Sequence, residues 1–407
     1  MPSIHWTGKH LATPKPASLA IDTIVHPNGF GYPKGKPNGR LILGDNLSVM
    51  AALLPDYEGR INLIYADPPF FTNRKFNARI GRGEDSRKPD EWELADGYHD
   101  DWLDLDEYLD FLYQRIALMY RLLAPNGTLY LHLDWHADAY ARLILDELFG
   151  TDNFLNEIIW AYHGPSPIRS AFNRKHDTIL SYVKGKDYIF NADAVREPYN
   201  ENTVNTFKSS GKAGFGKVPN LDRGKVPEDW WYFPVVARLH NERTGYPTQK
   251  PIALLERMVL ASSNPGDIVA DFFCGSGTTS FVALKHGRQF IACDESPRAI
   301  HTARGRLVGL KNVFTLERDN SIKLAHSRLP KTSKINLSDD LISLQTKLDL
   351  DYWEVDPSWD GKIFRSVAQA KRPVRSGNIP LELKIKIGGK SCIRFVTAKG
   401  RQYQLNI

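Results

Sequence analysis

The chain has 407 residues, more than one ordinary domain needs, so we expect a large core domain with additions. Its content of hydrophobic (42%) and charged (25%) residues is that of a globular protein, and no stretch is long and apolar enough to predict a membrane span. The amino terminus does not have the layout of a signal peptide, and three scattered cysteines exclude a disulfide framework, so we expect a cytoplasmic protein.

The net charge of +6 is unevenly distributed along the chain. Residues 321–407 contain 16 Lys and Arg against 8 Asp and Glu, and residues 160–250 contain 14 against 9, so the remainder is net acidic. Basic faces on a near-neutral core favour a polyanionic partner. A solvated basic surface would explain either segment equally well.

The first part of the chain predicts an arm followed by a βαβ unit. Residues 1–40 are rich in Pro and Gly and show no period, which indicates an extended arm. A short strand at 41–43 is followed by a helix at 46–54, capped by Asp45 or Asn46, and by a strand at 61–65. This order predicts parallel strands that are buried on both faces.

The second of these strands ends in Asp67-Pro68-Pro69-Phe70. Neither proline can donate a hydrogen bond to a neighbouring strand, so the pair ends the strand. The strand end then presents a carboxylate, a rigid carbonyl and an aromatic ring side by side. These three groups could bind an exocyclic amino group on a flat heterocycle, although a plain strand-to-loop stop has the same residues.

The next segment, residues 71–103, is irregular and densely charged, which indicates a lid, a substrate-contacting loop or a linker. An amphipathic helix is predicted at 106–123, a strand at 128–133 and a helix at 137–149. His132, Asp134 and His136 alternate near the end of that strand. We predict no metal site there, because the strand does not continue and no fourth ligand is present.

Two more strands are predicted at 157–162 and 177–183, and a region of different composition lies around and after them. It contains a basic loop at 207–217 and the aromatic cluster 229–233, which lies near Arg238, His240 and Arg243. Basic residues interleaved with aromatic ones can bind phosphates and stack on bases. The aromatic residues could instead form the small core of an inserted subdomain.

A nucleotide-type site follows at residues 268–294. The strand 268–271 leads into Phe272-Phe273-Cys274-Gly275-Ser276-Gly277-Thr278 and then a helix, and the next strand, 289–293, ends at Asp294. No Lys follows Gly277, which excludes a P-loop, and Ser280 stands where a dinucleotide fingerprint needs a third glycine. The glycine loop and the spaced acid indicate a cofactor that carries adenosine.

The helical pattern fades after residue 304. Residues 311–348 look polar and linker-like, and the alternating strands of 381–407 predict a small basic β domain over 349–407.

Together, these motifs resemble the β class of S-adenosylmethionine-dependent amino-methyltransferases of DNA, in which the catalytic motif precedes the cofactor loop. The resemblance covers residues 41–310 and is closest to the modification subunits of type III restriction systems and to solitary adenine methyltransferases. It implies an α/β fold, a circularly permuted Rossmann-like methyltransferase fold with a mostly parallel seven-stranded sheet and helices on both faces. Residues 41–158 and 246–310 would be the catalytic and cofactor halves, and 159–245 the target-recognition insert.

The resemblance also implies residue roles. Asp67 and the Pro68 carbonyl would accept hydrogen bonds from N6 of a flipped adenine. Pro69 would complete the catalytic motif, and Phe70 would stack on the base. Asp271 would lie near the methionine amino group of the cofactor, Asp294 would bind its ribose and Asp45 its adenine amino group. The other residues expected at the cofactor are Thr248, Gln249, Lys250, Pro251, Phe272, Phe273, Gly275, Ser276, Gly277 and Thr278. The residues expected to contact DNA are Arg74, Lys75, Lys208, Lys212, Lys217, Trp231, Arg238 and Arg243.

Several alternatives stay open at this point. Cytosine N4 could be the target instead of adenine N6, although cytosine enzymes usually carry Ser where Asp67 stands. RNA or protein substrates and a non-catalytic DNA-binding protein are further alternatives, and the missing third glycine disfavours a nicotinamide oxidoreductase. We expect double-stranded DNA as partner, a homodimer or a restriction subunit as possible additions, and a prokaryotic or phage origin.

Overall fold

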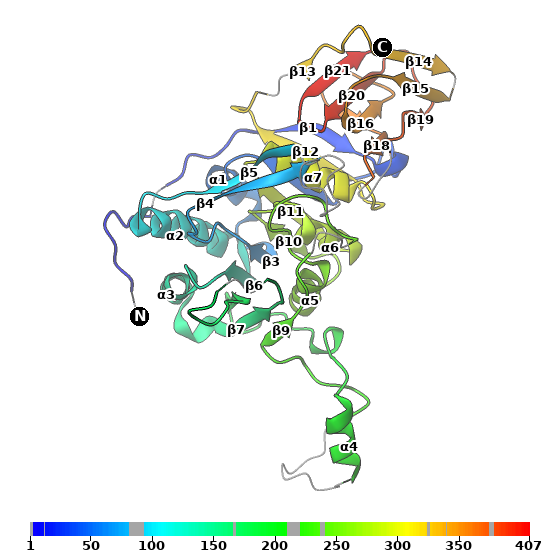
Figure 1. The fold of residues 1–407 in the computed structure, drawn as a ribbon. Helices are drawn as coiled ribbons and strands as arrows, with labels where there is room; N and C mark the ends of the chain where they lie inside the picture. Colours follow the sequence, from blue (N-terminus) through cyan, green and yellow to red (C-terminus); the bar gives the residue numbers. More distant parts are fainter. Residues whose placement is uncertain are drawn as a thin grey trace.

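The computed structural model describes residues 3–11, 13–80, 93–165, 168–209, 220–236, 241–323, 326–338, 340–373 and 378–407. Within these residues, the central feature is an eleven-stranded sheet in the order β17-β1-β12-β2-β11-β10-β3-β6-β8-β7-β9 (Figure 1). The six strands from β12 to β6 in this order run parallel to one another, whereas β8 runs antiparallel to both β6 and β7. The strands of this sheet are β1 (Leu19–Val25), β2 (Gly39–Leu43), β3 (Ile61–Ala66), β6 (Leu123–Leu133), β7 (Phe154–Ala161), β8 (His176–Val183), β9 (Trp230–Tyr232), β10 (Ile268–Asp271), β11 (Gln289–Asp294), β12 (Phe314–Asp319) and β17 (Phe364–Ser366).

Helices cover both faces of this sheet. The apolar side chains of α1, α2 and α3 pack into one core cluster with one set of strand residues, and those of α5, α6 and α7 pack into a second cluster with the alternate set. Ile64 and Leu63 illustrate the alternation: the two neighbours are fully buried on opposite faces of β3. The helices are α1 (Asn46–Tyr57), α2 (Leu105–Leu122), α3 (Asp138–Phe149), α4 (Glu201–Ser209), α5 (Ile252–Ser262), α6 (Thr278–Lys285) and α7 (Pro297–Leu307).

The predicted fold class is confirmed, and the sheet is wider than the seven strands expected. Part of the difference lies at its β12 edge, where β1 pairs antiparallel with β12 and parallel with β17. Residues 19–25 therefore form a strand of the sheet, whereas the sequence predicts an extended arm. The Pro- and Gly-rich surroundings conceal a short run of Ile, Thr and Val, which are residues that favour strands.

Two further segments are more ordered than the sequence suggests. Strands β4 (Arg74–Ile80) and β5 (Glu93–Asp100) form an antiparallel hairpin within the segment expected to be irregular. The expected linker 311–348 contains β12 as well as β13 (His326–Ser327), β14 (Lys334–Ser338) and β15 (Leu341–Gln345). Polar side chains hide both sets of strands from a search for apolar periodicity.

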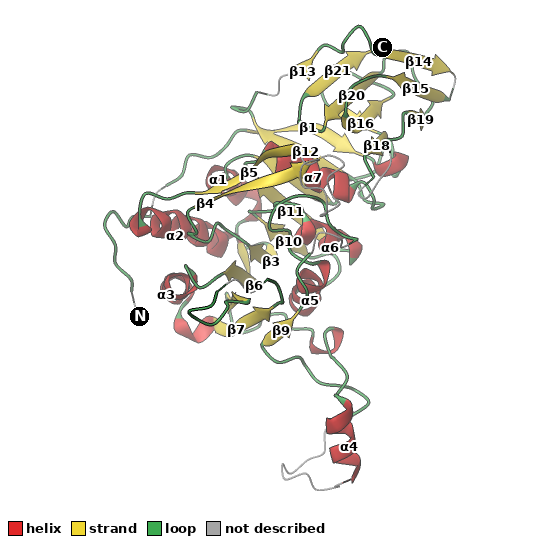
Figure 2. Cartoon of the chain, viewed as in Figure 1, coloured by secondary structure: helices red, strands yellow, loops and turns green. Residues whose placement is uncertain are grey.

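The C-terminal region is built from strands, as Figure 2 shows by colour, and has its own core around Trp353 and Phe395. Its remaining strands are β16 (Leu350–Asp356), β18 (Ala368–Lys371), β19 (Glu382–Lys384), β20 (Cys392–Thr397) and β21 (Gln402–Asn406). At the opposite end of the molecule, α4 projects away from the sheet (Figure 1). No helix in the described ranges has the length and apolar character needed to cross a membrane.

Candidate active site

A cavity of about 980 Å³ lies at the carboxyl ends of the parallel strands. This edge is where residues that follow separate strands meet, and open α/β sheets bind ligands there. All four predicted catalytic residues, Asp67, Pro68, Pro69 and Phe70, line the cavity. So do the predicted cofactor residues Asp45, Thr248, Gln249, Lys250, Asp271, Phe272, Phe273, Gly275, Ser276, Thr278 and Asp294, but not Pro251 or Gly277.

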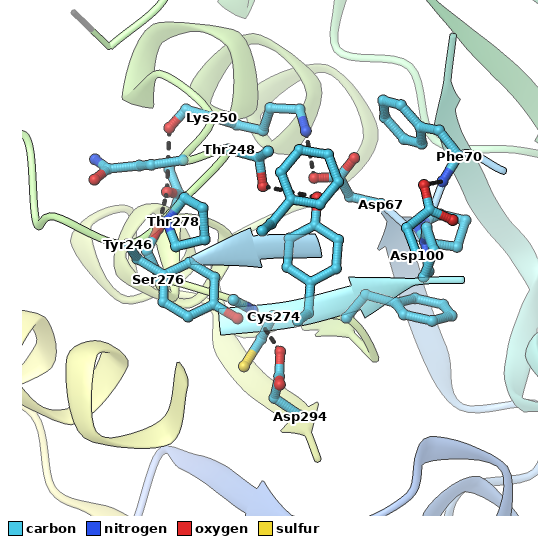
Figure 3. A pocket seen from close by; sticks show the side chains of 18 of the residues that line it. Asp67, Phe70, Asp100, Tyr246, Thr248, Lys250, Cys274, Ser276, Thr278 and Asp294 are labelled. Atoms are coloured by element: carbon cyan, nitrogen blue, oxygen red, sulfur yellow. Dashed lines mark hydrogen bonds and ion pairs between the residues drawn. The ribbon is translucent and has the colours of Figure 1, made fainter. Parts of the chain in front are cut away.

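Asp67 follows β3, and its two carboxylate oxygens have different surroundings. Oδ2 forms an ion pair with Nζ of Lys250 (Figure 3), whereas Oδ1 is buried and has no hydrogen-bond partner within the described residues. Tyr108 Oη donates to the carbonyl of Pro69 at 2.9 Å, and not to that of Pro68. The site therefore contains a buried acceptor that its own chain leaves unsatisfied, which is costly unless a ligand binds to it.

A buried carboxylate that the sequence did not reveal, Asp100, organises the turn that carries Phe70. It accepts hydrogen bonds from the backbone N–H groups of Phe70 (3.2 Å), Phe71 (3.0 Å) and Thr72 (2.8 Å), as well as from Thr72 Oγ1 (2.6 Å) and Trp102 Nε1 (2.7 Å). Phe71 is held in the left-handed region with φ of 65°, which is unfavourable for a bulky residue. Asp100 thus fixes a strained turn at the predicted base-stacking residue.

The ring of Phe70 rests on a buried polar network. It stacks on His132 with ring centroids 5.8 Å apart. Tyr65 Oη is 2.7 Å from Nδ1 of His132, and Nε2 of His132 is 3.1 Å from Asp177, which also accepts from Tyr162 Oη at 2.9 Å. His132 therefore supports the platform under Phe70.

Asp134 and His136, which alternate with His132 in the sequence, pair with each other. His136 Nδ1 lies 2.9 Å from the carboxylate of Asp134, and Asp134 lines the cavity. Among the described residues, no group of three or more His, Cys, Asp or Glu side chains is placed to hold a metal ion.

The glycine loop between β10 and α6 forms the other half of the site. Gly275 and Gly277 have φ of 47° and 73°, so both adopt the left-handed conformation that glycine tolerates. A Cβ at Gly275 would lie 3.2 Å from the ring of Tyr246, and one at Gly277 would lie 2.7 Å from Cβ of Ala303 on α7. Gly275 therefore lets the Tyr246 ring approach the loop, whereas Gly277 allows α6 and α7 to pack closely.

Two carboxyl groups, those of the buried Asp271 and the half-buried Asp294, flank this loop. Asp294 accepts from the N–H groups of Gly275 and Ser296, both at 2.9 Å, and Asp271 accepts from Phe273 N at 3.0 Å and Thr279 Oγ1 at 2.6 Å. Burial raises the pKa of Asp271 to about 7 and that of Asp294 to about 6, although these hydrogen bonds oppose the shift.

The loop of residues 244–251 lies across the cavity from Asp67. The Gln249 side chain is used within this loop, because it accepts from Thr244 N at 2.8 Å and donates to the carbonyl of Glu242 at 2.7 Å. Thr248 accepts from Tyr98 Oη on β5 at 3.3 Å. Lys250 reaches Asp67, so the structure places its ammonium at the predicted catalytic residue and not at the cofactor loop.

Asp45 does not offer a free carboxylate. Its Oδ2 caps α1 by accepting from Ser48 N at 2.9 Å, and its Oδ1 forms an ion pair with Arg115 at 3.0 Å. A ligand that donates to Asp45 would bind an oxygen that already accepts from Ser48 or Arg115.

The predicted DNA-contacting residues are dispersed. Arg74, Lys75 and Arg243 line the cavity, and Lys208 is exposed on α4. Lys212, Lys217 and Arg238 lie outside the described residues. Trp231 is only 8% exposed and donates from Nε1 to the carbonyl of Glu228 at 2.8 Å, so its burial does not fit a DNA contact.

The aromatic residues on either side of Trp231 are much more accessible, with Trp230 65% and Tyr232 52% exposed. Strand alternation explains the difference, since neighbouring side chains on β9 point to opposite faces.

Comparison with known proteins agrees with this geometry. A family model described as DNA methylase matches residues 61–305, more than half of the chain. The chain belongs to the DNA methylase family. The match begins with β3 and ends within α7, so it contains both Asp67 and the glycine loop of the cavity. The protein is therefore a methyltransferase that acts on DNA.

The alignments with two curated relatives cover most of each relative's length. The methylase is 32% identical over 289 residues to the type II methyltransferase M.HpaI of Haemophilus parainfluenzae, a match that covers 71% of this chain and 78% of that one. It is 30% identical over 300 residues to the DNA adenine methyltransferase YhdJ of Escherichia coli (strain K12), covering 73% and 90%. A solved structure of TTHA0409 from Thermus thermophilus, a protein named as a putative DNA modification methylase and complexed with S-adenosyl-L-methionine, is 23% identical with a TM-score of 0.44, covering 70% and 99%.

Proposed function

We propose that this methylase transfers a methyl group from S-adenosylmethionine to N6 of a flipped-out adenine in duplex DNA. The observation that carries the proposal is the unsatisfied, buried Oδ1 of Asp67, which lies beside Phe70 in the same cavity as the glycine loop. The name of the Escherichia coli relative, which specifies adenine, supports the choice of base.

The residues of the cofactor half fit S-adenosylmethionine. At Gly275, any larger residue would place its Cβ 3.2 Å from Tyr246, so glycine lets the Tyr246 ring lie against the loop at the edge of the cavity. Asp294 lies at the end of β11, where a carboxylate can accept from ribose hydroxyls, and Asp271 can attract a cationic amino group. S-adenosylmethionine supplies a methyl group on a positively charged sulfur. The chain's residues then bind and orient both reactants.

The catalytic half fits an exocyclic amino group. The adenine amino nitrogen is conjugated and weakly nucleophilic, so two acceptors that hold its hydrogens would direct its lone pair towards the methyl group. Asp67 Oδ1 and the Pro68 carbonyl are these acceptors, and Phe70 is the stacking surface. Because a paired base cannot reach the cavity, the base must leave the duplex.

The remaining parts of the chain have proposed roles that follow from position and charge. Residues 159–245, which include the projecting α4, would read the DNA sequence, and the basic region 349–407 would add non-specific attraction to the backbone. A dimer and a restriction subunit are proposed on the family resemblance alone. DNA as substrate favours a cytoplasmic location in a prokaryotic or phage-infected cell.

The test is transfer of labelled methyl from S-adenosylmethionine to unmethylated genomic DNA, followed by mass analysis of the nucleosides. Wild type should produce N6-methyladenine, and Asp67→Ala should lower the rate by about 10²- to 10³-fold, since it removes a group that acts on the reacting nitrogen. The control is Asp56→Ala, an exposed carboxylate near the carboxyl end of α1, which should leave the rate unchanged.

N4-methylcytosine as the product would retain the mechanism and change the base. Unlabelled DNA from an enzyme that binds S-adenosylmethionine would contradict the proposal.

A further inference from the structure

The Lys250 side chain contacts two residues that the proposed function assigns to the target base, Asp67 and Phe70. Its ammonium pairs with Oδ2 of Asp67 and lies over the ring of Phe70, 5.3 Å from the centroid. Figure 3 shows the ammonium directed at Asp67, with Phe70 beside that contact. A carboxylate and an aromatic face are also the two groups that would receive adenine.

From this coincidence we infer that the Lys250 ammonium occupies the space beside Asp67 and Phe70 until the target base, which donates to Oδ1 of Asp67, enters and displaces it. Both groups present N–H donors to a carboxylate, and both lie on an aromatic face, the ammonium by cation–π attraction and adenine by stacking. The ammonium and a stacked base would occupy the same space next to Phe70. Because this role rests on the proposed function, its test starts from an enzyme that methylates DNA.

The main chain of Lys250 is anchored separately from its side chain. Thr278 Oγ1 donates to the carbonyl of Lys250 at 3.2 Å, and Pro251 occupies the N-cap of α5. The loop can therefore stay in place while the flexible side chain leaves Asp67. A lysine suits such an exchange, because its single ammonium on a long stem lacks the fixed fork of arginine.

The exchange has a consequence for specificity. The Asp67 and Lys250 side chains are only 18% and 10% exposed, so separating them without replacement leaves two poorly solvated charges. A base with an exocyclic amino group gives Asp67 a new donor at Oδ1, which offsets the bond that Oδ2 loses, whereas thymine has no such group. Lys250 would thus oppose bases that cannot donate to Asp67.

Substitution of Lys250 should reveal this competition as a change in KM. Lys250→Ala removes the competing ammonium, so we expect the KM for DNA to fall by about tenfold, or ~1.4 kcal/mol, with the affinity for S-adenosylmethionine unchanged. Lys75→Ala, which removes another cavity-lining cation, should instead raise the KM, because it only weakens attraction to phosphates. If Lys250→Ala does not fold, Lys250→Gln, which keeps a neutral donor for Asp67, should give a smaller decrease in KM.

The decisive measurement adds propylammonium chloride, which supplies the three carbons and the ammonium that Lys250→Ala removes. Initial rates of methyl transfer to DNA are compared for wild type and Lys250→Ala, with tetramethylammonium chloride at equal concentration as the control for salt. We expect propylammonium to inhibit the variant competitively with DNA and to leave wild type unaffected.

Three results would overturn the inference. Restoration of a lost rate by propylammonium would mean that the ammonium takes part in the reaction. Weaker binding of S-adenosylmethionine by Lys250→Ala at unchanged KM for DNA would place Lys250 in the cofactor site. Equal inhibition of both proteins would mean that the amine acts elsewhere. A wild-type enzyme that transfers no methyl to DNA is a different outcome, because it removes the proposed function itself.

Discussion

Asp100 illustrates how one buried carboxylate can determine the shape of a catalytic turn. Five donors from residues 70–72 and Trp102 converge on its two oxygens, and the turn includes a residue with positive φ. Hydrogen bonds to an ionised acceptor are stronger than neutral ones, so together they can hold a strained backbone. The position of Phe70 therefore depends on a residue that lines the cavity from the far end of β5.

We expect Asp100→Asn to lower kcat by about tenfold or more, because an amide nitrogen would face N–H donors and leave at least one of them unsatisfied. The affinity for S-adenosylmethionine should stay unchanged, since the turn carries the base platform and not the glycine loop. Calorimetric binding and steady-state rates measure the two effects. Asp101→Asn, which changes the neighbouring exposed carboxylate, is the matched control. A parallel loss of cofactor affinity would assign Asp100 a general structural role.

At this scale, the sequence predicts residues that belong to a compact motif. Asp67 and Phe70 can be recognised because two prolines and a strand end mark them. Asp100 belongs to no motif, since most of its partners are groups of residues 70–72, which lie about thirty residues away and meet it only in the folded chain. Lys250 is marked by its own motif, which predicts a contact with the cofactor. Its ammonium lies at Asp67 instead, because spacing along the chain does not show where a long side chain points.

Among the elements, the strands β10 and β11 and the loop between β10 and α6 place two protonatable carboxyls next to each other. Burial raises the pKa of Asp271 to about 7 and that of Asp294 to about 6. Each folded-state value lies above the ordinary value of an aspartate, so the folded protein binds these protons more tightly than the unfolded chain does. Without cofactor, this tighter proton binding makes the free energy of unfolding decrease as the pH rises from about 4 to 7.

The same shift predicts how cofactor binding depends on pH. The ionised forms of both carboxyls bind a cationic amino group and ribose hydroxyls better, so the dissociation constant of S-adenosylmethionine should rise as the pH falls from about 8 to 5. The increase should approach about tenfold per pH unit where one proton is taken up. Titration calorimetry across this range measures it. Asp271→Asn should bind more weakly at high pH and show a shallower dependence; an unchanged slope would exclude Asp271 as its source.

The β4–β5 hairpin shows why some elements could not be predicted. Its strands carry many charged residues, so they lack the alternating apolar pattern on which a strand prediction depends. Contacts with distant residues support it instead, such as the hydrogen bond from Tyr98 to Thr248. By contrast, the sequence predicts α2 and the parallel strands β2, β3, β10 and β11 to within a few residues, because their apolar side chains form runs or repeats typical of these elements.

On the scale of the whole molecule, the C-terminal region is joined to the methylase core by charges as well as by a strand. Asp351 on β16 contacts Arg298 and His301 of α7, at 3.3 and 2.8 Å, and Arg372 at 3.3 Å. Burial favours a higher pKa for Asp351, but the hydrogen bond from His301 and the charges of His301, Arg298 and Arg372 hold it at about 2. Its stabilising effect is therefore complete above pH of about 4 and is lost as the pH falls from about 4 to about 2.

We expect Asp351→Asn to lower the free energy of unfolding by about 2–3 kcal/mol at neutral pH, because the change leaves partly buried cations without a counter-charge. Thermal and urea denaturation measure the loss. Asp360→Asn breaks the more exposed pair with Arg365 and should cost less than about 1 kcal/mol. Equal effects of the two substitutions would show that burial does not strengthen the contact between α7 and β16.

The pairing of β1 also has a consequence for when the sheet can form during synthesis. In β1, Leu19 pairs with Asp319 and Thr23 pairs with Phe364, so both neighbouring strands come from the last third of the chain. Such distant pairing slows folding and leaves strand edges open until late. During synthesis, β1 can therefore pair with its two neighbours only after residues 314–319 and 364–366 have left the ribosome.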